Sequence, residues 1–144
     1  MKTVLQRVTR AQVRVDGAVV GEIGRGLLAL CAIEKGDGAA DVRVTAEKLV
    51  TLRCFPGATP MDRSVLEVGG SVLLVSQFTL AADTTRGLRP GFASAAAPAL
   101  AETLYDEVLQ RLLAAHQPVA SGVFGAAMQV SLINDGPVTF LLET

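Results

Sequence analysis

The sequence predicts an α+β fold, a single compact domain over residues 1–144 with antiparallel or mixed β-sheets and two main helices. The chain has 144 residues, 50% of them hydrophobic, which is enough apolar material for one domain with its own core. Strand-like and helix-like segments follow one another in the order strands, helix, strands, helix, strands. Hairpin signals outnumber possible βαβ units, which favours antiparallel or mixed pairing over an all-parallel sheet.

Strand patterns dominate the N-terminal part of the chain. Residues 2–15 have strand character, with apolar and polar residues alternating toward the end of the segment. Asp16-Gly17 is a strong hairpin signal, so residues 18–23 are expected to form the return strand. The apolar run at 27–33 is short enough for a third, buried strand.

Two later segments place apolar side chains at helical spacing, residues 42–50 and residues 99–115. Pro98 suits the first turn of the second helix. Between the two helices, residues 71–75 predict another buried strand, which ends at Ser76.

The C-terminal part predicts two strands separated by a turn. Apolar and polar residues alternate over 128–132, and residues 138–142 form the last expected strand. Asn134–Pro137 carries the residues of a turn. Residues 83–92 are polar and contain Gly and Pro, which predicts a loop.

Charge and cysteine content limit the possible function classes. The net charge is −1, whereas a protein that binds nucleic acid mainly through its phosphates is normally basic. Cys31 and Cys54 lie in apolar runs and form no CxxC pair, which is typical of reduced core thiols. The N-terminus has no signal-peptide pattern and no apolar run reaches membrane-spanning length, so we expect a soluble cytoplasmic protein.

The standard hydrolytic centres are missing from the sequence. His116 is the only histidine, and near the end of a helix it is expected to be a solvent-exposed cation. No serine lies in a GxSxG sequence, and no cluster of ligands predicts a metal site. An enzyme with this sequence would therefore depend on main-chain groups, hydroxyls and the substrate's own functional groups.

Two segments concentrate polar groups, and each allows a structural or a functional interpretation. SQFTL at 76–80 follows a buried strand, so it is either a strand cap with Phe78 and Leu80 in the core or one edge of a cleft. NDGPVTF at 134–140 is either a hairpin turn and nothing more, or a special site with a cis Gly-Pro bond.

The same two segments carry a resemblance to a known family. The sequence resembles the D-aminoacyl-tRNA (D-tyrosyl-tRNA) deacylases of the bacterial and general eukaryotic type, nearly from end to end. The matching segments are QRV at 6–8, GEIGRGLL at 21–28, GGSVLLVSQFTLAAD at 69–83, RPGF at 89–92, TLYD at 103–106 and MQVSLINDGPVTF at 128–140. The segment GATPMDRS at 57–64 departs from the family pattern, which leaves the role of this loop open.

The resemblance implies a homodimeric enzyme without a cofactor that hydrolyses the ester bond of D-aminoacyl-tRNA, and of glycine mischarged on tRNA. In the family, the segment corresponding to Ser76, Gln77, Phe78 and Thr79 lines the pocket for the 3′-terminal adenosine and its aminoacyl ester. An N–H group of this segment is expected to stabilise the oxyanion, and the ribose 2′-OH to orient water.

The resemblance also implies how the two enantiomers are distinguished. The family's Gly-Pro pair, here Gly136-Pro137, is cis and enters the pocket of the partner subunit, where its carbonyls exclude L-side chains. Arg7 is expected to hold this loop in place. Arg86 and Arg89 are candidates for contacts with the phosphates of the acceptor stem, or are solvated loop residues.

Two function classes remain as alternatives. One is a nucleic-acid-binding protein of the same fold without deacylase activity, against which the acidic composition argues. The other is a structural or interaction protein that has lost the activity, against which the intact SQFTL and GPVT segments argue.

Overall fold

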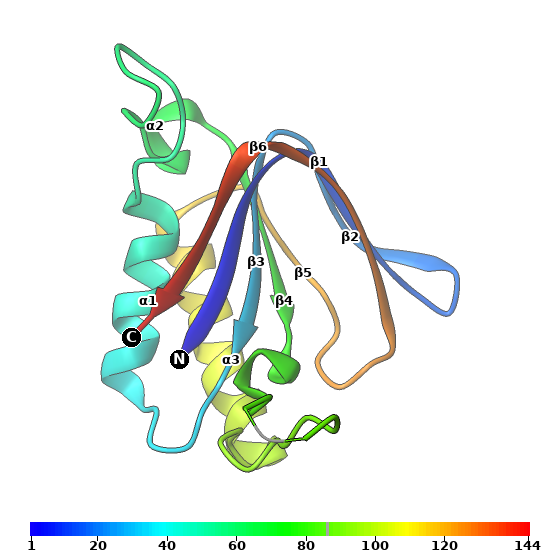
Figure 1. Cartoon of the computed structure of the whole chain (residues 1–144). Coiled ribbons are helices and arrows are strands. Elements are labelled where there is room, and N and C mark those ends of the chain that lie inside the picture. Colours follow the sequence, from blue (N-terminus) through cyan, green and yellow to red (C-terminus); the bar gives the residue numbers. More distant parts are fainter. Residues whose placement is uncertain (86) are drawn as a thin grey trace.

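The computed structural model describes residues 1–85 and 87–144. Over these residues it contains one six-stranded sheet of mixed pairing, with helices packed on one face (Figure 1). The elements are β1 (Lys2–Val15), β2 (Ala18–Ile23), β3 (Gly26–Ala32), α1 (Ala39–Thr51), α2 (Val65–Val68), β4 (Ser71–Ser76), the 3₁₀ turn η1 (Phe78–Ala81), α3 (Pro98–Ala115), β5 (Val119–Ser121) and β6 (Met128–Glu143). The predicted mixed sheet and two main helices are confirmed.

Strand β1 organises the sheet because it pairs along both of its edges. One edge pairs with β6 over almost its whole length, and the other pairs with β3 and then with β2, all antiparallel. The β1–β2 hairpin turns at Asp16 and Gly17, which both have positive φ, 50° and 80°. This is the conformation that the Asp-Gly sequence predicts for a two-residue hairpin.

The sheet continues from β3 through β4 to β5 by parallel pairing. Helix α1 lies in the connection from β3 to β4, and α3 in that from β4 to β5. Gly26 allows the close approach of β3 to β4, because a Cβ there would lie 1.9 Å from the carbonyl oxygen of Ser71. Two parallel connections therefore accompany the hairpins, which makes the sheet mixed.

Each face of the sheet has its own apolar core. The larger core packs α1 and α3 against the sheet, with fully buried residues such as Leu49, Val108 and Leu112 on the helices. The second core lies on the opposite face and includes Val13 and Leu73, with Met128, Val130 and Leu132 of β6 packed against it. In Figure 1, β1 and β6 bend together over the top of the molecule.

The prediction that a turn at Asn134–Pro137 separates two strands is wrong. β6 continues through it from Met128 to Glu143 and stays paired with β1 on both sides, with register shifts in between. The local sequence has turn residues, but pairing with the continuous strand β1 decides the outcome. The segment therefore bulges out of β6 instead of reversing the chain.

The expected exposure of His116 is also wrong. His116 is only 8% exposed, and its Nε2 lies 2.6 Å from the carbonyl oxygen of Gly70. Because a carbonyl only accepts hydrogen bonds, Nε2 carries a proton and donates it. His116 is the C-cap residue of α3, and its ring contacts Gly70, which directly precedes β4. Separately, no helix in the described residues is long and apolar enough to span a membrane.

Candidate active site

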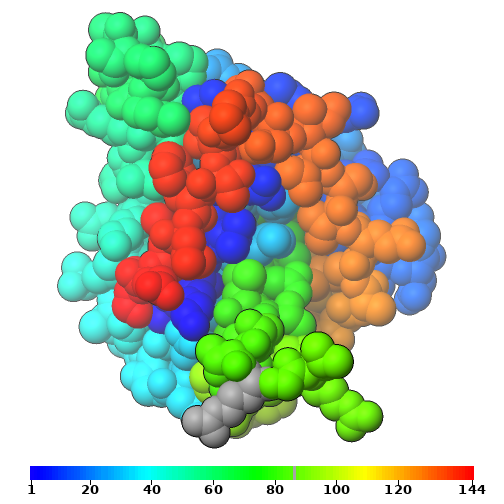
Figure 2. All heavy atoms as spheres, in the orientation of Figure 1, coloured from blue at the N-terminus to red at the C-terminus, as the bar shows by residue number. Residues whose placement is uncertain are grey.

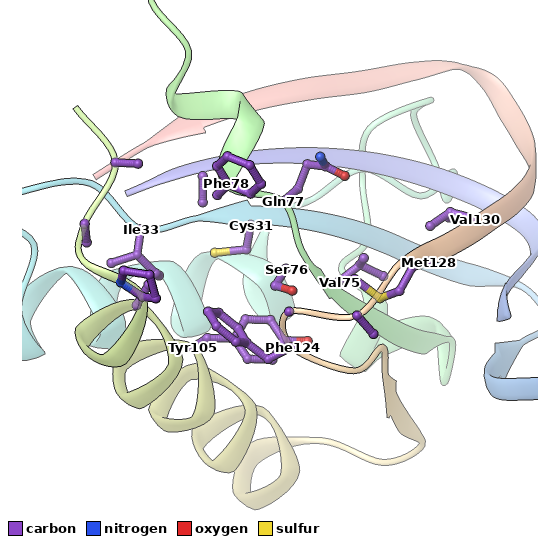
Figure 3. A pocket seen from close by; sticks show the side chains of 17 residues that line it. Cys31, Ile33, Val75, Ser76, Gln77, Phe78, Tyr105, Phe124, Met128 and Val130 are labelled. Carbon is purple, nitrogen blue, oxygen red and sulfur yellow. The ribbon is translucent and has the colours of Figure 1, made fainter. Parts of the chain in front are cut away.

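A cavity of about 420 Å³ lies where the ends of β3 and β4 meet η1, α3 and the start of β6 (Figure 3). This volume is in the range of small-molecule sites. Most lining side chains are apolar, and they come from segments far apart in the sequence. The labelled lining residues in Figure 3 are Cys31, Ile33, Val75, Ser76, Gln77, Phe78, Tyr105, Phe124, Met128 and Val130.

Two aromatic rings form one side of the cavity. Tyr105 of α3 and Phe124 have ring centroids 5.8 Å apart, tilted by 49°. The Tyr105 hydroxyl donates to the carbonyl oxygen of Leu74 at 3.0 Å, and burial raises the pKa of this phenol. Tyr105 is therefore a neutral, fixed component of the pocket rather than a proton-transfer group at neutral pH.

The polar edge of the cavity is the segment that the SQFTL motif predicts. Ser76 ends β4, and the N–H of Gln77 donates to the Cys31 carbonyl at 2.8 Å, which attaches the segment to β3. The chain then turns into η1. Among the described residues, no protein acceptor pairs with the N–H groups of Phe78 and Thr79, so both remain available to a ligand.

The side chains of the SQFTL segment differ in their placement. Ser76, Gln77 and Phe78 line the cavity, whereas Thr79 does not. The amide Nε2 of Gln77 donates to Thr79 Oγ1, so Thr79 positions Gln77. Phe78 is 59% exposed, which rules out the interpretation of the motif as a strand cap with Phe78 in the core.

Cys31 also lines the cavity, but its chemistry is that of a core thiol. It is 2% exposed, and burial raises its pKa. A protonated thiol is a poor nucleophile, so Cys31 contributes shape rather than covalent catalysis. Both cysteines are free and buried, as the sequence predicts.

Gly136 and Pro137 lie in the bulge of β6, and their peptide bond is cis, as the resemblance implies. Residues 135–138 stand opposite the single residue Arg7 of β1. The flanking register pairs are Gln6 with Thr139 and Val8 with Asn134. Gly136 and Pro137 are both exposed, so the bulge projects from the surface.

Arg7 and Asn134 determine the shape of this bulge. Arg7 Nε lies 3.1 Å from the Asp135 carbonyl oxygen, and its Nη1 donates to the Cys54 carbonyl at 2.6 Å. Asn134 Nδ2 donates to the carbonyl oxygens of Arg7 and Val138 at 2.9 and 3.1 Å. The resemblance implies that Arg7 holds this loop in place, and these distances put Arg7 in contact with it. Asn134 was not predicted.

Within one chain, the pocket and the Gly-Pro bulge remain separate. Arg7, Gly136 and Pro137 are not among the cavity-lining residues in the described chain. Figure 2 shows both parts on one face, with the green atoms around residues 75–80 between the red and orange parts of β6. The predicted site residues therefore form two groups, one recessed and one projecting.

The loop after η1 lies beside the cavity. The backbones of Asp83 and Gly91 exchange two hydrogen bonds of 2.7 and 2.9 Å, which close the loop. Hydrogen bonds from the hydroxyl and N–H of Thr85 hold the pKa of the Asp83 carboxyl below its usual range. Arg89 is exposed on this loop, and Arg86 lies outside the described residues.

The divergent segment at 57–64 forms a separate loop. It is closed by pairing of Phe55 with Arg63, and the Asp62 carboxylate accepts from the N–H of Ala58 at 2.8 Å. None of these residues lines the cavity. In the part of the chain that the structure describes, no group of three or more His, Cys, Asp or Glu could bind a metal ion.

The lining residues that the sequence analysis missed are mostly apolar. Phe124 lies between β5 and β6, without a periodic pattern, so the sequence gives no signal for it. Met128 and Val130 belong to the alternating pattern that predicted a strand, and this alternation is the signal that could have placed them at the site. Tyr105 lies on the apolar face of α3.

Comparisons with known proteins identify the family of the chain. A model of the family described as D-Tyr-tRNA(Tyr) deacylase matches residues 4–143. A D-aminoacyl-tRNA deacylase of Methylococcus capsulatus is 57% identical over 99% of this chain and 94% of its own length, and one of Anaeromyxobacter dehalogenans is 54% identical over 100% and 97%. A solved structure named c-Myc DNA Unwinding Element Binding Protein superposes with a TM-score of 0.95 at 38% identity, covering 100% of this chain and 99% of that one. The chain therefore belongs to the D-Tyr-tRNA(Tyr) deacylase family.

Proposed function

We propose that this protein hydrolyses the ester bond of D-aminoacyl-tRNA in the cytoplasm, and that of glycine mischarged on tRNA, and that it releases free tRNA and the amino acid. The observation that carries the proposal is the pairing of an apolar cavity with two unbonded N–H groups on its rim segment, those of Phe78 and Thr79. The family names of the relatives indicate the same reaction.

The reaction follows from what the pocket offers. The 3′-terminal adenosine occupies the apolar cavity, which places the aminoacyl ester at Ser76–Thr79. Water attacks the ester carbonyl, and an N–H of Phe78 or Thr79 stabilises the negative charge that develops on the carbonyl oxygen. The bond from the carbonyl carbon to the ribose 3′-oxygen then breaks, and the 3′-oxygen takes a proton. The neighbouring 2′-OH of the ribose orients the attacking water and so takes the place of a base from the protein.

Chirality is selected by exclusion rather than by attraction. A pocket that must accept many different D-side chains cannot recognise each of them. A rigid obstacle at the α-carbon instead rejects every L-side chain and still admits glycine, which has no side chain. The main-chain carbonyls of Gly136 and Pro137 are suited to this task because substitutions do not remove them. Arg7 and Asn134 hold the bulge that presents these carbonyls.

The exposed bulge and the recessed pocket support the proposal of a two-fold dimer. Gly136 and Pro137 project from the surface and do not reach the pocket of their own chain. In a two-fold dimer, each chain inserts its bulge into the pocket of its partner, so the contacts are reciprocal. Two complete sites then form, each from Ser76–Thr79 of one chain and Gly136–Pro137 of the other.

Mixing two inactive variants tests this arrangement. Ala126→Phe fills the cavity from a half-buried loop position, and Gly136→Leu disables the bulge. Each variant alone should be inactive on D-Tyr-tRNA. In a random mixture, half of the dimers are mixed and carry one intact site, so activity should return to about a quarter of the wild-type value.

The outcomes separate the alternatives clearly. Circular dichroism must show that each variant is folded, and light scattering that it is dimeric. A mixture that stays inactive although mixed dimers form would place both groups of one site in the same chain. An active monomer would contradict the dimeric site altogether.

A second candidate function is binding of DNA, which the name of the structurally similar protein suggests. The net charge of −1 argues against binding that depends on many phosphate contacts. Titration of the protein with labelled duplex and single-stranded DNA at physiological salt tests this candidate. Tight DNA binding together with absent deacylation would favour it over the hydrolase.

A further inference from the structure

An exposed pair of phenyl rings lies at the rim of the cavity. Phe78 is 59% exposed and Phe92 is 39% exposed, and their ring centroids are 5.1 Å apart at a tilt of 57°. Only 4% of the residues are aromatic, and Phe55 is fully buried while Phe124 and Phe140 are half-buried. Exposure of two adjacent rings is therefore a specific feature of this rim and not a general property of the chain.

Two independent tethers fix the position of the pair. The reciprocal backbone bonds between Asp83 and Gly91 place Phe92 directly after a closed loop. The Ser94 hydroxyl donates to the carbonyl of Ala81, the last residue of the 3₁₀ turn that begins at Phe78. The two rings therefore keep their relative position without burial, as a preformed binding surface does.

The pair is continuous with the pocket and has a positive charge nearby. Phe78 lines the cavity itself (Figure 3), and Phe92 packs against Phe78 without lining the cavity, so the pair adjoins it. Arg89 is exposed on the loop that carries Phe92, and it forms no ion pair with any described residue. An exposed ring face on a loop that also carries a guanidinium matches the two parts of an unpaired nucleotide, its base and its phosphate.

We propose that Phe78 and Phe92 form a stacking surface for the unpaired nucleotide that precedes the terminal adenosine of the tRNA, with Arg89 near its phosphate. This proposal rests on the proposed function. If the terminal adenosine fills the cavity, the chain of the tRNA must leave through its opening, where the two rings lie. Stacking on a ring tolerates any base, which suits an enzyme that must accept many tRNAs.

Stacking contributes to binding of the tRNA and not to the chemical step. Removal of the Phe92 ring should therefore raise KM for D-Tyr-tRNA by about 5- to 150-fold, the range for one base on an aromatic ring, and leave kcat nearly unchanged. The same change should leave KM for 3′-O-(D-tyrosyl)adenosine unaltered, because this minimal substrate has no preceding nucleotide.

The experiment compares these two substrates on the wild type, Phe92→Ala and Phe92→Tyr. Phe92→Tyr keeps the ring and should restore the wild-type KM for D-Tyr-tRNA. Val19→Ala is the matched control, because Val19 is 44% exposed on β2 and lines no part of the cavity. Light scattering on every variant shows whether the dimer is intact.

The alternatives give different results. If Phe92→Ala raises KM equally for both substrates, or for neither, the stacking proposal is wrong while the deacylase function stands. If Phe92→Ala changes the oligomeric state, the rings pack against a second subunit and the proposal is also wrong. Wild-type protein that hydrolyses neither substrate contradicts the deacylase function itself.

Discussion

The guanidinium of Arg7 contacts both the backbone carbonyl and the side-chain carboxylate of Asp135. The Nε atom of Arg7 lies 3.1 Å from the carbonyl oxygen of Asp135 and 3.1 Å from its carboxylate Oδ2. The Arg7 side chain is 11% exposed, and it also donates to the carbonyl of Cys54. One guanidinium thus connects the residue before Gly136 to the chain segment after α1, so the position of the Gly-Pro bulge depends on it.

Replacement of Arg7 by alanine should therefore affect both stability and activity. Loss of charge-assisted hydrogen bonds from a nearly buried group should lower the free energy of unfolding by about 1.5–3 kcal/mol. Activity on D-Tyr-tRNA should fall because the bulge loses its support. Urea unfolding and a deacylation assay measure the two effects. Arg10→Ala, an exposed change on the same strand, is the control. Equal behaviour of the two variants would remove Arg7 from the account.

Gly136 should not tolerate a side chain. A Cβ at this position would lie 2.6 Å from Asn134 Oδ1, and Asn134 is already held by two hydrogen bonds to backbone carbonyls. Gly136→Ala should therefore displace the Asn134 side chain, lower the free energy of unfolding by about 1–3 kcal/mol and reduce activity. Gly24→Ala, where nothing lies within 4 Å, should change neither quantity. A fully active Gly136→Ala variant would show that the shape of the bulge is not critical.

His116 should act in stability and not in catalysis. Its ring donates to the Gly70 carbonyl and is almost fully buried, so His116→Ala leaves this acceptor without its partner. The expected cost is about 1–3 kcal/mol in the free energy of unfolding, with kcat unchanged at temperatures where the variant is folded. Gln117→Ala, an exposed change at the neighbouring residue, should cost less than about 0.5 kcal/mol. Loss of kcat in folded His116→Ala protein would show that the sole histidine has a chemical role.

Cys54 should make the protein less stable at alkaline pH. Burial raises the pKa of its thiol to about 11, against an opposing effect of Arg7. The folded pKa therefore lies above the unfolded value of about 8.5, and the stabilisation is complete below that value and is lost as pH rises toward 11. Cys54→Ser removes the titration. Urea unfolding should show the stability advantage of wild type over Cys54→Ser shrinking over this interval, and a constant difference would contradict the raised pKa.

Local patterns predicted most of the fold because its longer elements are locally consistent. Asp16-Gly17 specified the β1–β2 hairpin, and Pro98 marked the first residue of α3. The shorter elements were missed. β5 has only 3 residues and α2 only 4, which is too short for a periodic pattern. Their formation depends on long-range contacts, such as the parallel pairing of β5 with β4.

The site was predicted where a motif carries it and missed where tertiary packing creates it. The resemblance carried by SQFTL predicted Ser76, Gln77, Phe78 and Thr79 at the pocket, and the structure places the first three at the cavity but not Thr79. The exposure of Phe78 next to Phe92 depends on how the loop at 83–91 closes, which the sequence does not reveal. In the same way, the burial of His116 depends on a backbone carbonyl 46 positions away.

Hydrolysis of D-Tyr-tRNA compared with L-Tyr-tRNA under identical conditions tests the central claim most directly. The selection by exclusion described above predicts that the wild-type protein releases D-tyrosine rapidly and leaves L-Tyr-tRNA intact at the same enzyme concentration. It also predicts that glycyl-tRNA is hydrolysed, because glycine has no side chain for the Gly136–Pro137 carbonyls to exclude. Equal rates on the two enantiomers, or release of neither amino acid, would contradict the account.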